Sequence, residues 1–178
     1  MDYDPDPVAS IQSYYGQDVK AVVANSADKG WEVWCRKQWV HFINKNHAGY
    51  IARDEQRIFA DDRRKAVDVW ISHGNNNALV ELKCLKPGED NKAFSDRIFK
   101  DVNKLADGEK LGFNGVPNGA RIWVLGLAVV INLEEDAFMK EMSSMLAVGS
   151  DFRGGEFKCI PEQLGPDHVM FVITWTRL

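Results

Sequence analysis

The chain has 178 residues, of which 27% are charged and 45% are hydrophobic, and its formal net charge is −4. This length fits one domain with a full hydrophobic core, and the charge excludes a strongly basic protein that coats nucleic acid or a membrane surface. The net charge does not exclude a nuclease, because a phosphate backbone responds to the local charge and to a bound metal rather than to the net charge.

The chain has three cysteines that are widely spaced, and no two of them form a C-x-x-C motif: Cys35, Cys84 and Cys159. This spacing argues against a disulfide framework or a zinc site and indicates a reducing compartment, so we expect a cytoplasmic protein. The N-terminus lacks the apolar segment of a Sec signal peptide, and the longest apolar run is about half a bilayer span. We therefore expect a soluble protein without membrane contact, and export of a toxin by another route stays open.

The first half of the chain predicts two helices and three strands. Apolar residues at helical spacing predict a helix over residues 8–27, and a second helix, dense in tryptophan, from about residue 28 to residue 46. A polar turn of sequence HGNNN joins the second and third strands, since its Gly and Asn residues tolerate positive φ. The three strands are expected over residues 50–59, 65–72 and 78–85.

The second half alternates helix and strand. A helix over residues 91–107 has apolar residues spaced four, four and three apart, and the apolar run over 120–130 is typical of a strand buried on both faces. A helix over 133–147 and a strand over 168–176 follow.

This order predicts one α/β domain: a central mixed β-sheet, formed by an antiparallel meander plus a crossover strand, flanked by helices. We expect a core over residues 28–131, an N-terminal helical addition over 1–27, and a C-terminal addition of one helix and one strand over 132–178.

The strand with the sequence ALVELKCL carries two full charges inside an apolar run. Because side chains alternate along a strand, Glu81 and Lys83 share one face, and the opposite face is wholly apolar. Asp68 lies on the preceding strand, on the face opposite the apolar residues of that strand. A four-residue loop that begins at residue 73 sets Asp68 opposite Glu81, and one that begins at residue 74 sets it opposite Lys83, so both pairings stay open.

Two carboxylates a few ångströms apart repel each other, which raises the pKa of one of them or requires a cation between them. Oxygen ligands beside a lysine suit Mg²⁺, for which Mn²⁺ can substitute. Such an ion polarises a phosphoryl oxygen and lowers the pKa of a bound water, while Lys83 orients the water or neutralises developing charge. The pattern therefore indicates hydrolysis of a phosphodiester.

The segments VDVWI and VELK, joined by a hairpin, resemble the PD-(D/E)XK nuclease superfamily, which has the restriction-endonuclease-like fold. The element order from about residue 28 to residue 130 is similar to that core and covers somewhat more than half of the chain. The resemblance implies a metal-dependent nuclease, with DNA rather than RNA as the expected substrate. The proline of the motif is absent, since Val67 precedes Asp68.

The resemblance also implies the roles of individual residues. Asp68 and Glu81 would bind the metal together with the backbone carbonyl of Leu82, and Lys83 would be the catalytic lysine. Glu32, on the first core helix, is the candidate for an additional catalytic acid, and Glu55 is a second choice.

Ordinary structure can also explain these residues. The spacing Glu-x-Lys recurs at Glu156 and Lys158, in a segment that we interpret as surface because it follows two glycines and no Asp-bearing strand precedes it. The alternative interpretation of Asp68, Glu81 and Lys83 is a cross-strand salt bridge on a half-exposed face, which contributes little stability.

Six basic residues are candidates for contacts with nucleic acid, and a solvated charged surface is the alternative. They are Arg63, Arg64 and Lys65, before the Asp68 strand, and Arg97, Lys100 and Lys104, on one side of the helix after the motif. A homodimer would explain cuts in both strands, and a partner protein would explain the short length. A second hypothesis is a catalytically silent domain of this fold that binds protein or nucleic acid.

Overall fold

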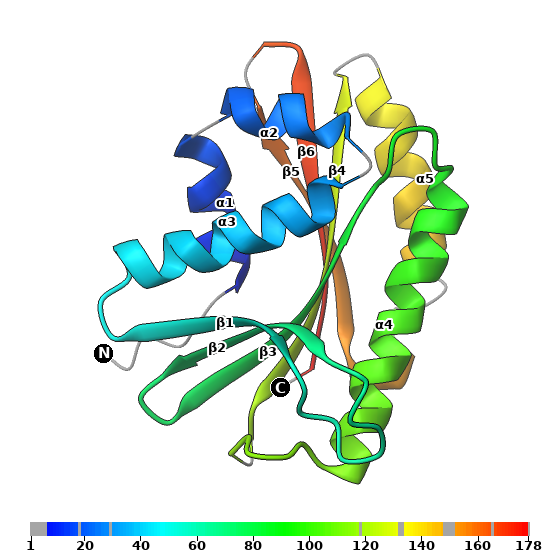
Figure 1. Cartoon of the computed structure of the whole chain (residues 1–178). Helices are drawn as coiled ribbons and strands as arrows, with labels where there is room; N and C mark the ends of the chain where they lie inside the picture. Colours follow the sequence, from blue (N-terminus) through cyan, green and yellow to red (C-terminus); the bar gives the residue numbers. More distant parts are fainter. Residues whose placement is uncertain are drawn as a thin grey trace.

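The computed structural model describes residues 7–17, 19–28, 30–117, 119–131, 134–147, 152–164 and 166–177. A short 3-10 helix lies over Phe152–Gly154, and five α-helices and six β-strands make up the rest of the regular structure in these ranges (Figure 1). In chain order they are α1 (Pro7–Gln17), α2 (Val19–Ser26), α3 (Trp31–Asn46), β1 (Tyr50–Gln56), β2 (Val67–His73), β3 (Asn76–Cys84), α4 (Asn91–Leu111), β4 (Arg121–Ile131), α5 (Glu135–Ala147), β5 (Glu156–Gln163) and β6 (His168–Arg177).

The strands form one mixed sheet in the order β1-β2-β3-β4-β6-β5. Of the described strands, only β3 and β4 pair in parallel, and α4 is the crossover between them. The expected α/β class, meander and crossover strand are thus confirmed. Two expectations were wrong in detail: the first helix is divided into α1 and α2, and the Glu156 segment forms an edge strand, β5, that had not been predicted.

Helices cover both faces of the sheet. The core on one face packs α1, α2 and α3 against β-strand residues such as Val80 and Leu127, and the core on the other packs α4 and α5 against residues such as Val124 and Phe171. Strands β4 and β6 are buried on both faces, which explains why their sequences are continuously apolar. Among the described residues, no helix has the length and apolarity to cross a membrane.

Helix α4 approaches β4 closely because Gly126 has no side chain. A Cβ atom at this position would lie 2.5 Å from Cδ1 of Ile98 and 3.2 Å from Cζ of Phe94, both on α4. The glycine therefore sets the distance between α4 and the sheet, and α4 carries side chains that reach the polar centre described below.

We predict that Gly126→Ala lowers the free energy of unfolding by about 1–3 kcal/mol, because the added methyl group overpacks this contact. Gly16→Ala is the matched control, since no atom lies within 4 Å of its added Cβ in α1, and it should raise stability by about 0.5–1 kcal/mol through helix propensity. Urea denaturation of both variants measures this. Equal effects would contradict the account of Gly126.

Candidate active site

The site forms where β2 separates from β3. The two strands pair from His73 with Asn76 up to Val69 with Val80, around a two-residue turn, and the ladder ends there. Continued by one residue, this register sets Asp68 opposite Glu81, which decides between the two pairings that the sequence left open. The turn is shorter than the expected four residues, but its even length keeps the same faces together.

The side chain of Asp68 bridges the gap between the separating strands. Its Oδ2 accepts a hydrogen bond of 2.9 Å from the backbone N–H of Leu82, and its Oδ1 accepts one of 2.9 Å from Arg36 on α3. Arg36 also pairs with Glu55 on β1. Burial by itself would raise the pKa of Asp68, but Lys83, the Leu82 N–H and Arg36 outweigh it, so this pKa lies below its usual value. Asp68 is therefore held as a carboxylate.

Glu81 has the opposite electrostatic environment. Its side chain is only 1% exposed, and burial, with smaller contributions from the nearby Asp68 and Asp101, raises its pKa well above the usual value. Lys104 on α4 opposes this shift, with Nζ 2.6 Å from Oε1 of Glu81. Glu81 is therefore a carboxyl group that depends on a neighbouring cation to ionise.

Lys83 lies among several oxygen atoms. Its Nζ is 2.8 Å from Oδ2 of Asp101, 3.6 Å from Oδ2 of Asp68 and 3.7 Å from Oε1 of Glu32. It also donates a hydrogen bond of 2.9 Å to the carbonyl oxygen of Leu82. Burial would lower the pKa of Lys83, but Asp101, Asp68 and Glu32 outweigh it and hold this pKa above its usual value, so the ammonium stays charged.

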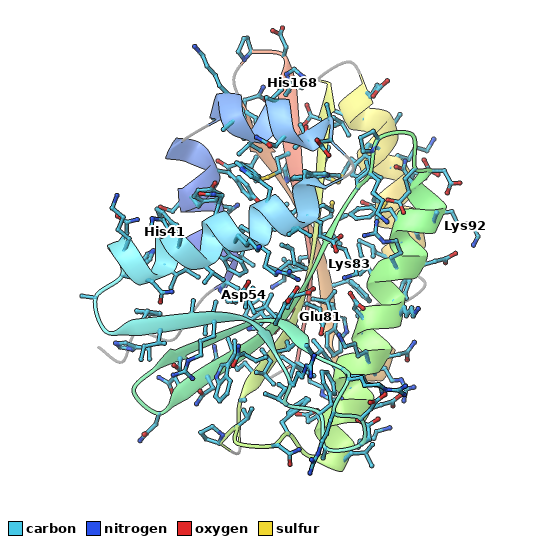
Figure 2. The ribbon with its side chains drawn as sticks, in the orientation of Figure 1. His41, Asp54, Glu81, Lys83, Lys92 and His168 are labelled. Atoms are coloured by element: carbon cyan, nitrogen blue, oxygen red, sulfur yellow. The ribbon has the colours of Figure 1, made fainter. Side chains whose placement is uncertain are left out.

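Glu32 lies at the edge of this centre. Its Oε2 accepts hydrogen bonds from the backbone N–H of Cys84, at 3.1 Å, and from Arg97, at 2.6 Å. Figure 2 shows Glu81 and Lys83 on the sheet between α3 and α4, the two helices that contribute Glu32 and Asp101. Both helices therefore reach the point at which β2 and β3 separate.

Three carboxylates could hold a divalent cation. One oxygen from each of Asp68, Glu81 and Asp101 lies within 4.8 Å of the others. Oε1 of Glu81 and Oδ2 of Asp101 are buried, and neither accepts a hydrogen bond of good geometry within the described ranges, although each lies within ion-pair distance of a lysine. A set of hard oxygen donors beside a backbone carbonyl, that of Leu82, fits Mg²⁺ or Mn²⁺.

Two residues of the centre were missing from the sequence prediction, Asp101 and Arg36. Asp101 carried a usable signal, since it lies three residues after Ile98 and four before Leu105, on the apolar face of its helix. An acidic residue on the apolar face of a helix is expected to have a hydrogen-bond or ion-pair partner, because burying an unpaired charge is unfavourable. Arg36 follows Glu32 by one helical turn and therefore faces the same side of α3.

The six basic residues predicted to contact nucleic acid occupy different environments. Arg97 is in ion pairs with Glu32 and Glu89, and Lys104 is in one with Glu81, so both side chains are held by carboxylates of the centre or beside it. Lys100 and Arg63 are exposed. Arg64 and Lys65 form exposed pairs with Asp62 and Asp61 in the loop before β2.

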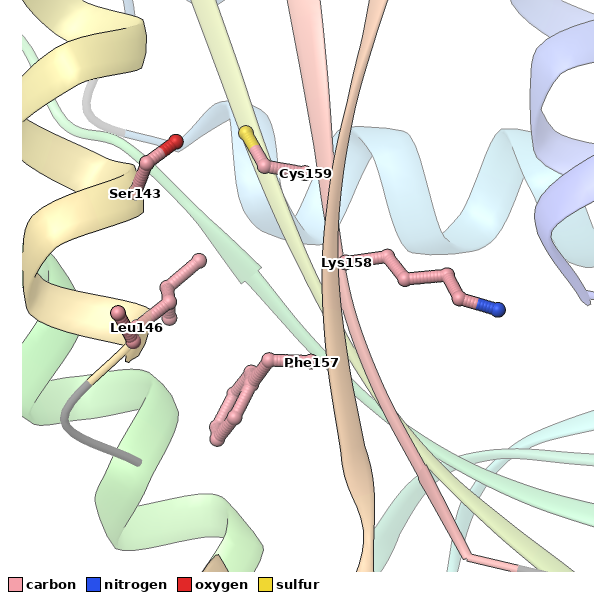
Figure 3. A pocket seen from close by; sticks show the side chains of 6 residues that line it. Ser143, Leu146, Phe157, Lys158 and Cys159 are labelled. Carbon is pink, nitrogen blue, oxygen red and sulfur yellow. The ribbon is translucent and has the colours of Figure 1, made fainter. Parts of the chain in front are cut away.

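The second Glu-x-Lys sequence lies apart from this centre, on the edge strand β5. Glu156 and Lys158 pair with each other at 3.2 Å and are 65% and 57% exposed. Figure 3 shows Lys158 pointing away from the hollow between α5 and β5, into which Phe157 and Cys159 point. The same three-residue pattern thus gives a buried multi-residue centre on β3 and a solvated pair on β5.

Comparisons of the chain with protein-family models, with curated proteins and with solved structures each gave no match. The interpretation of the site therefore depends on its geometry and chemistry.

We predict that Glu81 makes the metal-free protein less stable as the pH rises. A raised carboxyl pKa contributes stability that is complete below the unfolded value of about 4.3 and is lost as pH rises through the folded value. Glu81 should lower the free energy of unfolding by up to about 1.4 kcal/mol for each unit of pH increase. The variant Glu81→Gln should abolish this slope. Glu156→Gln, at the exposed copy of the motif, should leave the slope unchanged.

Urea denaturation in EDTA across the acid and neutral range measures this dependence. Asp68 changes stability in the opposite direction, because its pKa is lowered in the folded protein. Its contribution to the free energy of unfolding is lost only as the pH falls below the usual carboxyl range, so the effects of Asp68 and Glu81 occur in different pH ranges. A wild-type slope that Glu81→Gln leaves intact would contradict the assignment.

Proposed function

We propose that this protein is a metal-dependent nuclease of the PD-(D/E)XK type, which hydrolyses phosphodiester bonds in DNA rather than RNA. The single observation that carries the proposal is the meeting of Asp68, Glu81 and Lys83 at the separation of two strands, with Lys83 Nζ 3.6 Å from Oδ2 of Asp68. The order of α3, the β1–β3 meander, α4 and β4 also supports it, because this is the order that the resemblance implies.

Asp68, Glu81 and the carbonyl oxygen of Leu82 would hold the metal, with Asp101 as a further oxygen donor within reach. When bound, Mg²⁺ or Mn²⁺ would polarise a phosphoryl oxygen and lower the pKa of a water molecule. Arg36 and the Leu82 N–H keep Asp68 ionised, so one negatively charged ligand is available before the metal arrives.

Lys83 would supply a fixed positive charge beside the reacting phosphate. Its ammonium is held by carboxylates from three elements, which orients it without depending on the substrate. Glu32 would position this lysine and connect it to Arg97, which in turn pairs with Glu89. Glu32 is thus assigned a positioning role rather than a place among the metal ligands.

The loop between β1 and β2 would contact the phosphate backbone. It carries Arg63, Arg64 and Lys65 and ends at Ala66, whose carbonyl oxygen accepts a hydrogen bond from Lys104 at the site. The pairs of Arg64 and Lys65 with aspartates are exposed, so exchanging an aspartate for a phosphate costs little.

A second candidate function is a catalytically silent binding module of the same fold. The observation that favours it is charge balance, since Glu81 and Asp101 each have a lysine ammonium within 2.8 Å. A centre neutralised in this way can be a structural ion-pair network. Activity distinguishes the two functions.

The test is degradation of plasmid, linear duplex and single-stranded DNA, and of RNA, with Mg²⁺ or with EDTA. We predict cleavage of DNA with Mg²⁺ only, and a loss of at least about 100-fold in Lys83→Met, as for a group that stabilises transition-state charge. Lys158→Met is the matched control, because it removes the lysine of the exposed Glu-x-Lys copy, and it should cleave like the wild type. Circular dichroism verifies that both variants are folded.

Absence of metal-dependent cleavage in the folded wild type would contradict the nuclease and favour the binding module. Equal activity of Lys83→Met and Lys158→Met would attribute the cleavage to another site or to a contaminant.

A further inference from the structure

Lys104 reaches the centre from α4 and makes contact with its most buried carboxylate. Its Nζ is 2.6 Å from Oε1 of Glu81 and donates a hydrogen bond of 2.6 Å to the carbonyl oxygen of Ala66. The ammonium also lies 5.3 Å from the centre of the Phe59 ring. The side chain is 26% exposed, whereas that of Glu81 is 1% exposed, so Lys104 links the buried carboxylate to solvent.

Glu81 cannot remain ionised in this environment without a cation, because burying an unpaired carboxylate is very unfavourable. Lys104 supplies that cation. The oxygen that it contacts, Oε1, is shielded from solvent and belongs to Glu81, one of the three residues that could hold a metal ion. Two cations a few ångströms apart in a poorly solvated site repel strongly. A metal ion bound to the carboxylate of Glu81 would lie within a few ångströms of this ammonium, so Lys104 and the metal compete for the carboxylate.

The two lysines of the centre differ in how firmly they are held. Lys83 has four oxygen neighbours, from Asp101, Asp68, Glu32 and the carbonyl group of Leu82, and its side chain is 17% exposed. Among the described residues, Lys104 has two oxygen partners, Oε1 of Glu81 and the carbonyl oxygen of Ala66. Lys104 is also attached to the rim of the site by a long flexible stem. Displacement of Lys104 thus requires the smaller rearrangement.

We propose that Lys104 is a resident cation that pairs with Glu81 in the metal-free protein and is displaced when a hard divalent cation binds. This inference rests on the proposed function, since it concerns the same metal site. It makes the metal-free fold stable with its carboxylates already assembled. It also makes Lys104 a competitor of the metal, so the lysine lowers metal affinity instead of contributing to it.

The first test compares Mn²⁺ binding by calorimetry in the wild type, Lys104→Met and Lys100→Met, without substrate. Lys104→Met should bind Mn²⁺ at least about tenfold more tightly, because the competing charge is gone. Lys100→Met removes the same charge from an exposed position one turn earlier on α4, and its affinity should stay within about twofold of the wild type. Unchanged or weaker binding by Lys104→Met would overturn the inference and make Lys104 a positioning residue for Glu81.

The second test uses the wild type alone and does not depend on the folding of a variant. An amine-reactive reagent and mass spectrometry report the labelling of each lysine with and without Mn²⁺. Labelling of Lys104 should rise severalfold with Mn²⁺, while Lys83 stays protected and the exposed Lys92 stays constant. If Mn²⁺ binds and Lys104 labelling does not change, displacement is overturned while the metal site stands. If no Mn²⁺ binds to the wild type or to Lys104→Met, the proposed function itself fails.

Discussion

The carboxylate of Glu81 is buried within a β-sheet, and it can be ionised there only if a positive charge accompanies it. The surrounding structure meets this requirement at one point, where β2 separates from β3. The separation leaves the backbone N–H of Leu82 free to bind Asp68, and it opens the face of β3 on which Glu81 and Lys83 lie. An uninterrupted β2–β3 ladder would leave no room for this centre.

Two helices from opposite sides of the sheet complete it. Helix α3 contributes Arg36, which fixes Asp68, and Glu32, which fixes the end of β3 through the N–H of Cys84. Helix α4 contributes Asp101 and Lys104, one carboxylate and one cation, and its close approach to β4 depends on Gly126. Acids and bases alternate across the centre, so each charge has an opposite neighbour. A site with this balance can assemble before any metal or substrate is present.

The sequence predicted most of the sheet, including the strand that carries Glu81 and Lys83, because these features depend on local patterns. Alternation in ALVELKCL placed Glu81 and Lys83 on one face, and the polar turn predicted the hairpin that brings Asp68 to them. The sequence left two choices for the pairing register of β2 and β3, because this register depends on the length and position of the turn. Asp101 and Arg36 were missed because tertiary packing of α4 and α3 brings them to the site. The inward position of Lys104 was missed for the same reason. Strand β5 was missed because the two glycines before it indicated a surface segment, and because, among the described strands, it pairs only with β6, which follows it in the chain.

The most direct measurement is X-ray diffraction from crystals soaked in Mn²⁺, with the metal located by its anomalous signal. The proposed site predicts one strong peak within coordination distance of carboxylate oxygens of both Asp68 and Glu81, with the ammonium of Lys104 withdrawn from Glu81. A crystal in which Lys104 still contacts Glu81, and in which no peak lies between the two carboxylates at saturating Mn²⁺, would contradict a metal centre at this position.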